Sequence, residues 1–398
     1  MRILQLSKHF PYPLKDGYSI AVSYIAKSLI DNGCAVELLT MNTTKHFLDL
    51  ATLPKNFNGY AKIHTVEVDN RITSFGAFKN LFSKESFILS RFITDGFAEK
   101  LAAVLTNGNF DIVQLESVQL APYIPVIRQH STAKIAMRAH NVEFEIWERQ
   151  IETTSFFPKK WYLQSQLTPF KKFEIEQLKN YDSLVAITDK DLTYFKNLGF
   201  SGKGISVPVG IDLKKYQSQS PVLSEILTFG FIGSLDWMPN QQGVKWFLEE
   251  VWPTVIDNNP TAKFYIAGRH APDWLTSQTH QNVIIEGEVA SAIKFIKTHP
   301  IMVVPLFSGS GIRVKILEGM ALNRVIITTK LGMEGIDSKH RKEILVADTR
   351  EGFLKEIDYC FENKKSLNKI GLEARQFIEN NFDNLTLGKR LKTFYQNI

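Results

Sequence analysis

Short runs of apolar residues alternate with helical patterns along almost the whole chain. Arg2–Ser7 has the composition of a buried strand, and Ile20–Asn32 follows with apolar residues at helical spacing until Gly33 ends the helix. Val36–Thr40 is then a second strand, so the chain opens with a strand–helix–strand unit. Three further strand-like runs follow at Asp111–Glu116, Lys134–Ala139 and Ser183–Thr188. This alternation predicts parallel α/β layers.

The pattern is interrupted once and then begins again. Between Ile205 and Ser224, prolines and glycine punctuate a polar stretch without clear periodicity, which is typical of a linker. The strand-like runs of the second series are Thr228–Ile232, Lys263–Ala267, Val283–Glu286, Ile301–Pro305, Val325–Thr329 and Ile344–Val346. We therefore predict an N-terminal domain over 1–210, a linker over 211–224, a second domain over 225–380 and a closing helix over 381–398. Two such sheets predict a ligand cleft between them.

Length and composition agree with two globular domains. The 398 residues exceed the ~250–300 at which one hydrophobic core stops growing, and 44% hydrophobic with 22% charged residues is ordinary for a globular protein. No apolar run approaches the ~18 residues of a membrane span, and the start does not resemble a signal peptide. Cys34 and Cys360 lie far apart, which argues against a disulfide framework and for a reducing cytoplasm.

Positive charge indicates the kind of partner. The formal net charge is +6 and the pI is near 9.0. This balance favours an anionic partner, either a phosphorylated substrate or an acidic membrane surface.

A strand, a glycine-rich turn and a helix follow one another from Ile301 to Ala321. Gly309 and Gly311 allow close backbone approach, and free N–H groups at a helix start favour a phosphate. Arg313 and Lys315 add cations in the first turn, where the helix dipole alone would prefer acids. A surface ion pair between Lys315 and Glu318 is the simpler explanation, but the coincidence of strand, turn and cations favours phosphate binding.

The run from Val303 to Gly335 resembles the donor-binding core of the family 4 glycosyltransferases, which have the GT-B fold. The matching branch has a helix that reads Gly-Ser-Gly-x-Arg-x-Lys-x-Leu-Glu, here Gly309, Ser310, Gly311, Arg313, Lys315, Leu317 and Glu318. The resemblance implies two Rossmann-like domains whose parallel sheets face across a cleft, with a C-terminal helix packing back toward the N-terminal domain. It also implies that Glu318 binds the ribose, and that Arg313 or Lys315 neutralises the leaving group. The backbone of Gly309, Ser310, Gly311 and Ile312 would hold the sugar and diphosphate.

Other segments extend the resemblance over most of the chain. Phe231–Asn240, with Gly233 and Ser234, resembles the first strand and loop of the branch's donor domain. Segments ending at Arg269 and Val289 resemble later strand ends, the second beside the nucleobase.

The first domain matches at two places. His140, in Arg138–Glu143, resembles a histidine near the transferred sugar, although an isolated histidine is more often a satisfied polar residue. Gly17 stands where the family commonly has paired glycines near the donor phosphate, and a simple Asp-Gly turn explains it nearly as well.

Three positions depart from the family pattern. Many members have Glu where this chain has Ser310, and Arg and Lys where it has Ser234 and Gln242. Arg313 and Lys315 would replace the missing charge, as the branch pattern suggests. The resemblance therefore indicates the class of enzyme but not the donor sugar.

A metal site is not expected. Asp189 and Asp191 match the Asp-x-Asp metal signature of another transferase architecture, but they open a predicted helix, where capping and the dipole explain both acids. We predict no metal and no cofactor besides the nucleotide diphosphate sugar, which is a co-substrate.

Two stretches combine aromatic and basic residues. Thr153–Phe173 has no acidic residue and four lysines among six aromatic side chains. Ser74–Phe97 has phenylalanines together with three basic residues, Lys79, Lys84 and Arg91. Such composition suits the interface of an anionic membrane leaflet. Core aromatics beside a solvated face explain either stretch equally well.

The sequence thus predicts a retaining, metal-independent, hexosyltransferase-type glycosyltransferase that acts on an acceptor hydroxyl. We expect a glycan or lipid-linked acceptor, a role in envelope or exopolysaccharide synthesis, and a cytoplasmic location, peripheral at the inner membrane face. Nucleic acid is not an expected partner. The alternatives are a sugar-nucleotide epimerase or hydrolase of the same fold, and a non-catalytic nucleotide-sugar-binding module.

Overall fold

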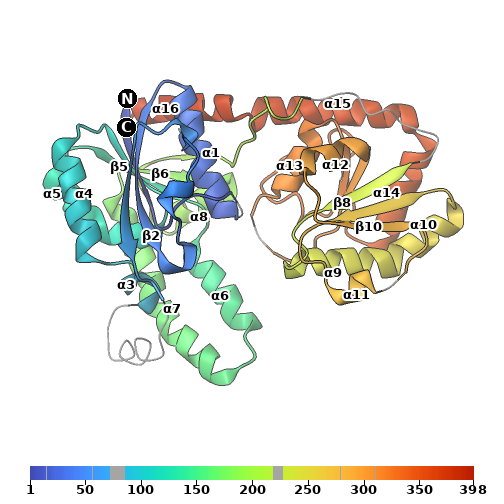
Figure 1. The fold of residues 1–398 in the computed structure, drawn as a ribbon, viewed down its shortest axis with the longest axis horizontal. Helices are drawn as coiled ribbons and strands as arrows, with labels where there is room; N and C mark the ends of the chain where they lie inside the picture. The colour runs from blue at the N-terminus through green and yellow to red at the C-terminus, as the bar shows by residue number, and fades with distance from the viewer. Residues whose placement is uncertain (15, 56, 72–85, 218–226, 278, 310) are drawn as a thin grey trace. The chain divides into compact units, whose positions relative to one another are not determined.

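The structure is a computed structural model of the chain, and it describes all residues except 15, 56, 72–85, 218–226, 278 and 310. Its contacts divide the chain into two compact units (Figure 1). The first unit contains Met1–Gly210 together with Asn384–Ile398, and the second contains Ile211–Asp383. The chain therefore leaves the first unit once and returns to it for its last residues. In the described ranges, no helix has the length and apolar character needed to cross a bilayer.

A parallel sheet of seven described strands forms the centre of the first unit, in the order β3-β2-β1-β4-β5-β6-β7. Its strands are β1 (Arg2–Ser7), β2 (Ala35–Thr43), β3 (Lys62–Val68), β4 (Ile112–Leu115), β5 (Lys134–Ala139), β6 (Ser183–Ala186) and β7 (Lys203–Ser206). Its α-helices are α1 (Gly17–Asp31), α3 (Phe87–Ser90), α4 (Asp95–Asn107), α5 (Ile124–His130), α6 (Glu143–Thr153), α7 (Phe157–Gln177), α8 (Asp189–Asn197) and α16 (Asn384–Gln396). The central strands are apolar because helices cover both faces.

Alternate residues of β1 belong to different hydrophobic cores. Leu4 and Leu6 join the core that includes α4 and α5, whereas Ile3 joins the core beneath α1 and α16. Helices α1 and α16 approach each other closely at Gly388. A Cβ added to this glycine would lie 2.4 Å from the Ser28 carbonyl oxygen, so there is no room for a larger residue. The expected return of the C-terminal helix to the N-terminal part of the chain is confirmed.

The second unit has a parallel sheet of six described strands in the order β10-β9-β8-β11-β12-β13. The strands are β8 (Thr228–Ile232), β9 (Lys263–Ala267), β10 (Val283–Gly287), β11 (Ile301–Val304), β12 (Val325–Thr328) and β13 (Leu345–Val346). The α-helices are α9 (Met238–Trp246), α10 (Trp252–Asn258), α11 (Asp273–Thr276), α12 (Ala292–Thr298), α13 (Val314–Ala321), α14 (Arg350–Glu362) and α15 (Lys364–Asn381). Apolar side chains again fill a core on each face of the sheet.

The start of the second unit is packed rather than free. Ile211 and Tyr216 are buried in the core beneath α13 and α15, and the Ile211 N–H donates to the Phe382 carbonyl at 2.7 Å. The structure thus differs from the expected linker over 211–224 in its first part, because two buried apolar side chains anchor that part. The rest of the expected linker, from 218 onward, lies outside the described residues.

Strand order reverses once in each sheet, between β1 and β4 and between β8 and β11. Loops at the carboxyl ends of such strands diverge, which opens a crevice where ligands commonly bind in α/β sheets. The predicted phosphate-binding turn follows β11, and Gly233 follows β8. Gly17 lies beyond β1, and His140 directly follows β5.

Candidate functional site

The ammonium group of Lys315 lies over Gly233, the first residue of the loop after β8 in the second unit. Gly233 follows β8, and Lys315 lies in the first turn of α13. A Cβ added to Gly233 would lie 2.4 Å from Lys315 Nζ, so a larger residue would displace the ammonium. The same nitrogen lies 4.5 Å from the centroid of the Phe231 ring. Two predicted site residues from separate elements are thus brought together.

Asn240 holds this arrangement in place, and the sequence analysis did not single it out. Its side chain is 2% exposed, and its Oδ1 accepts a hydrogen bond from Lys315 Nζ at 2.8 Å. Its Nδ2 donates to the Ser234 carbonyl at 2.7 Å. One amide therefore links the loop after β8 to the lysine of α13. The available signal was a polar residue in the first turn of α9, just after the glycine-containing loop.

The charges of Lys315 and Arg313 favour a bound anion. Burial lowers the pKa of Lys315 to about 7, and the positive charge of Arg313 acts in the same direction while Glu318 opposes it. Burial also lowers the pKa of Arg313, against the attraction of Glu334. Two cations held close together in a partly buried site are destabilised relative to water. A bound anion would reverse that effect.

Arg313 and the glycine turn form the second part of the site. Arg313 is the N-cap residue of α13, is 5% exposed, and places its guanidinium carbon 5.4 Å from the centroid of the Trp237 ring. Gly309 and Gly311 have φ angles of 95° and 86°, a region that favours glycine. The Gly311 N–H donates to Glu334 Oε2 at 3.3 Å. The predicted glycines are therefore required by the turn itself.

Glu318 lies one turn further along α13. Its Oε1 accepts a hydrogen bond from the Tyr216 hydroxyl at 2.7 Å. Burial raises the pKa of Glu318, although Tyr216 and Lys315 both act to lower it. Tyr216 was not predicted to be near the site because it lies in the segment interpreted as a linker.

Other predicted donor-binding residues lie on neighbouring loops. Ile312 packs against the core beneath α13, and Val289 packs against the same core after β10. Arg269 follows β9, and its carbonyl accepts a hydrogen bond from the Leu235 N–H at 2.9 Å. Ser310 lies outside the described residues. The donor roles of these residues stay predictions.

A buried carboxylate organises the candidate site of the first unit. Glu116, at the end of β4, is fully buried, and its Oε2 lies 2.8 Å from His140 Nε2 and 3.3 Å from Arg138 Nη1. Gln5 and Gln114 both donate hydrogen bonds to its other oxygen. Burial acts to raise the pKa of Glu116, but Arg138 and His140 outweigh it, so the carboxylate stays ionised. Sequence reasoning missed this residue, whose signal was a charged residue at the end of an apolar strand.

The ionised carboxylate also determines the tautomer of His140. Burial lowers the pKa of His140, while the hydrogen bond to Glu116 raises it, and the net effect favours the neutral ring. Nε2 lies 2.8 Å from Glu116 Oε2 and 3.2 Å from Arg138 Nη1. A carboxylate only accepts hydrogen bonds, so the shorter of these two contacts assigns the proton of the neutral ring to Nε2. Nδ1 is then an acceptor. The Tyr18 ring, 5.0 Å away between centroids, packs against the imidazole.

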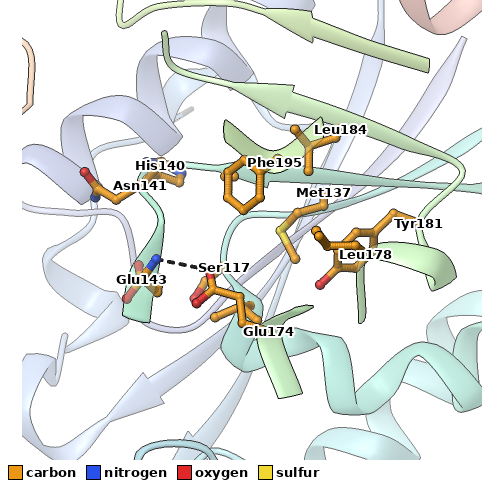
Figure 2. Close-up of a pocket in the computed structure, with 12 residues that line it drawn as sticks. Ser117, Met137, His140, Asn141, Glu143, Glu174, Leu178, Tyr181, Leu184 and Phe195 are labelled. Carbon is orange, nitrogen blue, oxygen red and sulfur yellow. Dashed lines mark hydrogen bonds between the residues drawn. The ribbon is translucent and has the colours of Figure 1, made fainter. Parts of the chain in front are cut away.

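Beside His140, a small pocket opens between β5, α6 and α7 (Figure 2). Figure 2 shows His140 and Asn141 on one side of it and Glu174 on the other. Glu174 accepts hydrogen bonds from the backbone N–H groups of Glu143 and Phe144 at 3.0 and 2.9 Å and so caps α6. Burial raises the pKa of Glu174 to about 8. This carboxyl group holds the segment that follows His140 in position.

Gly17 begins α1, where Asp16 is the N-cap residue and accepts a hydrogen bond from the Ser19 N–H at 2.9 Å. A Cβ added to Gly17 would meet no atom within 4 Å. Packing therefore does not require glycine here, and its role as a donor contact stays a prediction.

One cluster of metal-ligand residue types occurs among the described residues, formed by His9, Asp16 and His46. The rings of His9 and His46 stack with centroids 4.3 Å apart and planes 14° apart. Nitrogen lone pairs lie in the ring plane, so those of two nearly parallel rings do not converge on one ion. Both oxygens of Asp16 already accept hydrogen bonds from Ser19. The arrangement is therefore that of a stacked, capped loop rather than a formed metal site.

The Asp-x-Asp pair lies in the first turn of α8. Thr188 is the N-cap residue of α8, its hydroxyl accepts from the Asp191 N–H at 3.0 Å, and it donates to Asp191 Oδ2 at 2.7 Å. Asp189 accepts a hydrogen bond from the Ser206 hydroxyl. Both acids lie in the first turn, where the helix dipole favours them, but the cap itself is Thr188 and not either acid.

Comparison with known proteins gives a family match for part of the chain and a fold for the whole of it. Residues 227–363 match the family model described as glycosyl transferases group 1. An uncharacterized 44.6 kDa protein in the cps region of Klebsiella pneumoniae is 25% identical over 300 residues, which cover 71% of this chain and 74% of that protein. Sucrose-phosphate synthase from Thermosynechococcus elongatus superposes with a TM-score of 0.71 at 13% identity, covering 100% and 99% of the two chains.

HepE from Anabaena, solved in complex with UDP, superposes with a TM-score of 0.67 at 14% identity and covers 100% of both chains. These likenesses and the two parallel sheets confirm the predicted GT-B fold. Residues 227–363 thus match the glycosyl transferases group 1 model, and the whole chain has the GT-B fold.

Proposed function

We propose that this protein is a glycosyltransferase that moves a sugar from a nucleotide diphosphate sugar to an acceptor hydroxyl. The observation that carries the proposal is the ammonium of Lys315, held over Gly233 by Asn240 beside the glycine turn and Arg313. This group lies within the matched family domain. Cations and N–H donors fixed before the reaction stabilise a departing diphosphate, which is the difficult part of sugar transfer.

The glycine turn and α13 together provide groups for both the diphosphate and the ribose of the donor. We assign the diphosphate to Lys315, Arg313 and the backbone of the glycine turn, and the ribose to Glu318. Because Glu318 Oε1 accepts from Tyr216, the other oxygen is the one assigned to a ribose hydroxyl. HepE was solved with UDP and with UDP-glucose, which supports a nucleoside diphosphate sugar as the ligand class.

The reaction is assigned as a retaining transfer without a metal. The leaving phosphate would accept the proton of the acceptor hydroxyl, so no nucleophilic carboxylate is required. In the first unit, His140 is assigned to a sugar hydroxyl, with Nδ1 as the acceptor because Glu116 fixes the proton on Nε2.

The setting that we propose is envelope or exopolysaccharide synthesis at the cytoplasmic face of a membrane, with a glycan or lipid-linked acceptor. A relative described as lying in a cps region supports that setting.

Incubation with UDP and GDP sugars, with and without candidate acceptors, tests the proposal. A transferase releases nucleoside diphosphate only when an acceptor is present. An epimerase or hydrolase would convert the nucleotide sugar without an acceptor, and a binding module would bind it without turnover. Either of these two outcomes would replace the proposed function.

Asn240 variants should move the pKa of Lys315 in opposite directions. Asn240→Asp adds a negative partner that stabilises the ammonium, so the pKa should rise above about 7, and Asn240→Leu removes the acceptor, so it should fall. Activity that needs the charged lysine is present below this pKa and is lost as pH rises through it. Its alkaline limb should therefore move up in the Asp variant and down in the Leu variant.

The pKa can be measured by the pH dependence of acetic anhydride labelling of Lys315, followed by peptide mass spectrometry. Labelling needs no substrate, so it tests the hydrogen bond independently of the proposed function. Exposed Lys297, on α12 of the same unit, serves as an internal control within each sample. Identical labelling curves for Lys315 in wild type and both variants would contradict the role given to Asn240.

A further inference from the structure

An exposed aromatic and basic surface lies at the turn between α6 and α7. We call it the α7 tip, and it consists of Phe156, Phe157, Lys159, Lys160 and Trp161. The three aromatic side chains are 66%, 76% and 55% exposed in sequence order. Figure 1 shows α6 and α7 as a hairpin whose connecting turn lies at the end remote from the sheet of the first unit.

The aromatic residues of the α7 tip are exposed, whereas other aromatic residues of the two basic and aromatic stretches are buried. Phe92, Phe97 and Phe170 are buried in the core of the first unit, so burial explains them. Residues 72–85 of the other stretch lie outside the described residues. Burial does not explain the aromatics of the tip, because more than half of each side chain contacts solvent.

Helical spacing places the aromatic and basic groups of the tip together. Phe157 and Trp161 are four residues apart in α7 and therefore share a face, and Lys160 is three residues from Phe157. Three large apolar side chains that remain exposed within six residues are costly in water. A surface of this kind is favoured when a partner covers it.

Charge identifies the kind of partner. The first turn of α7 has no acidic residue, although the helix dipole favours acids there, and it has Lys159 and Lys160 instead. No acidic residue occurs anywhere from 153 to 173, and the nearest one before the turn is Glu152. The local cost of two cations at a helix start is offset by a partner with negative charge.

We propose that the α7 tip inserts into the interfacial region of an anionic lipid bilayer. Aromatic side chains partition into the boundary between headgroups and acyl chains, and lysines bind the anionic headgroups above it. A lipid surface fits both features at once, because it needs no shaped cavity and presents apolar and negative layers in sequence. The binding does not depend on a donor or an acceptor, so it stands apart from the proposed sugar transfer.

Vesicle sedimentation of the full chain tests the proposal. Wild-type protein should sediment with vesicles of phosphatidylglycerol and phosphatidylcholine, and much less with phosphatidylcholine alone. Neutralising Lys159→Gln and Lys160→Gln together should weaken binding by about 25-fold, roughly fivefold for each lysine. Phe156→Ser with Phe157→Ser should weaken it by about 10-fold or more.

Phe47→Ser is the matched control, because Phe47 is also an exposed phenylalanine of the first unit, at 61%. It should bind vesicles like wild type. Brominated lipids should quench tryptophan fluorescence of the wild type, and Trp161→Phe should remove that quenching. Far-ultraviolet circular dichroism of each variant checks that the fold is retained.

Three results would overturn the proposal. The first is wild-type protein that remains in the supernatant with anionic vesicles, as expected if the tip serves a protein partner. The second is equal binding by wild type and the two double variants. The third is a loss of binding with Phe47→Ser as large as that with the phenylalanines of the tip.

Discussion

Lys315→Ala and Arg313→Ala should each lower the rate of sugar transfer by about 10²-fold or more, with little change in thermal stability. Both side chains lie at the start of α13, and Lys315 is held by Asn240 directly over Gly233. The effect should fall mainly on kcat, because charge develops on the diphosphate as the bond to the sugar breaks. Steady-state rates of nucleoside diphosphate release measure it.

Two controls separate this effect from a general loss of charge or fold. Lys297→Ala removes an exposed lysine of the same unit and should leave the rate unchanged. Arg313→Lys keeps a cation at a position that is 5% exposed, so it should retain more activity than Arg313→Ala. Unchanged rates in both alanine variants would exclude the assigned diphosphate site.

Glu116→Ala should lower the free energy of unfolding by about 3–5 kcal/mol, because it leaves the buried guanidinium of Arg138 without its charged partner. The double variant Glu116→Ala/Arg138→Met should be more stable than Glu116→Ala alone, since it removes the uncompensated charge as well. Urea unfolding followed by circular dichroism measures both values. Equal stability of the single and double variants would show that the unpaired charge of Arg138 is not the reason why Glu116→Ala is destabilised.

Glu116→Gln serves as the near-isosteric comparison. It keeps the shape of the side chain but removes the negative charge. The hydrogen bond to the Glu116 carboxylate and its charge both raise the pKa of His140, and both are lost in this variant. The pKa of His140 should therefore fall further below its ordinary value, which NMR titration of the ring protons can follow. A rise would contradict the geometry described here.

Strand alternation was sufficient to predict two domains with parallel α/β layers, because apolar runs bounded by polar turns and helical patterns have few other solutions. The GT-B fold came from the family resemblance of the run from Val303 to Gly335. The glycine turn was also predictable, since positive φ angles at Gly309 and Gly311 leave a compositional trace. Contacts between distant segments left no such trace. Asn240 and Lys315 are far apart in sequence, and only the parallel neighbours β8 and β11 bring them together.

Polar residues were harder to interpret than apolar ones. Glu116 looked like the end of a strand, and its pairing with Arg138 and His140 depends on the register of β4 against β5. Tyr216 lay in a polar stretch without periodicity, yet its ring is buried and its hydroxyl binds Glu318. Single polar residues carry no period, so their partners are determined only by the three-dimensional fold.

The return of α16 to the first unit has a consequence for how the chain folds during synthesis. Leu387, Leu391 and Tyr395 of α16 pack in the same core as Ile3. The ribosome must therefore make the last residues before the core beneath α1 and α16 is complete. Until then, the nascent first unit exposes part of this core while the whole second unit is being made. Chains that stop before 384 should therefore be recognised by chaperones and proteases as incomplete, even though the proposed donor site is already present in them.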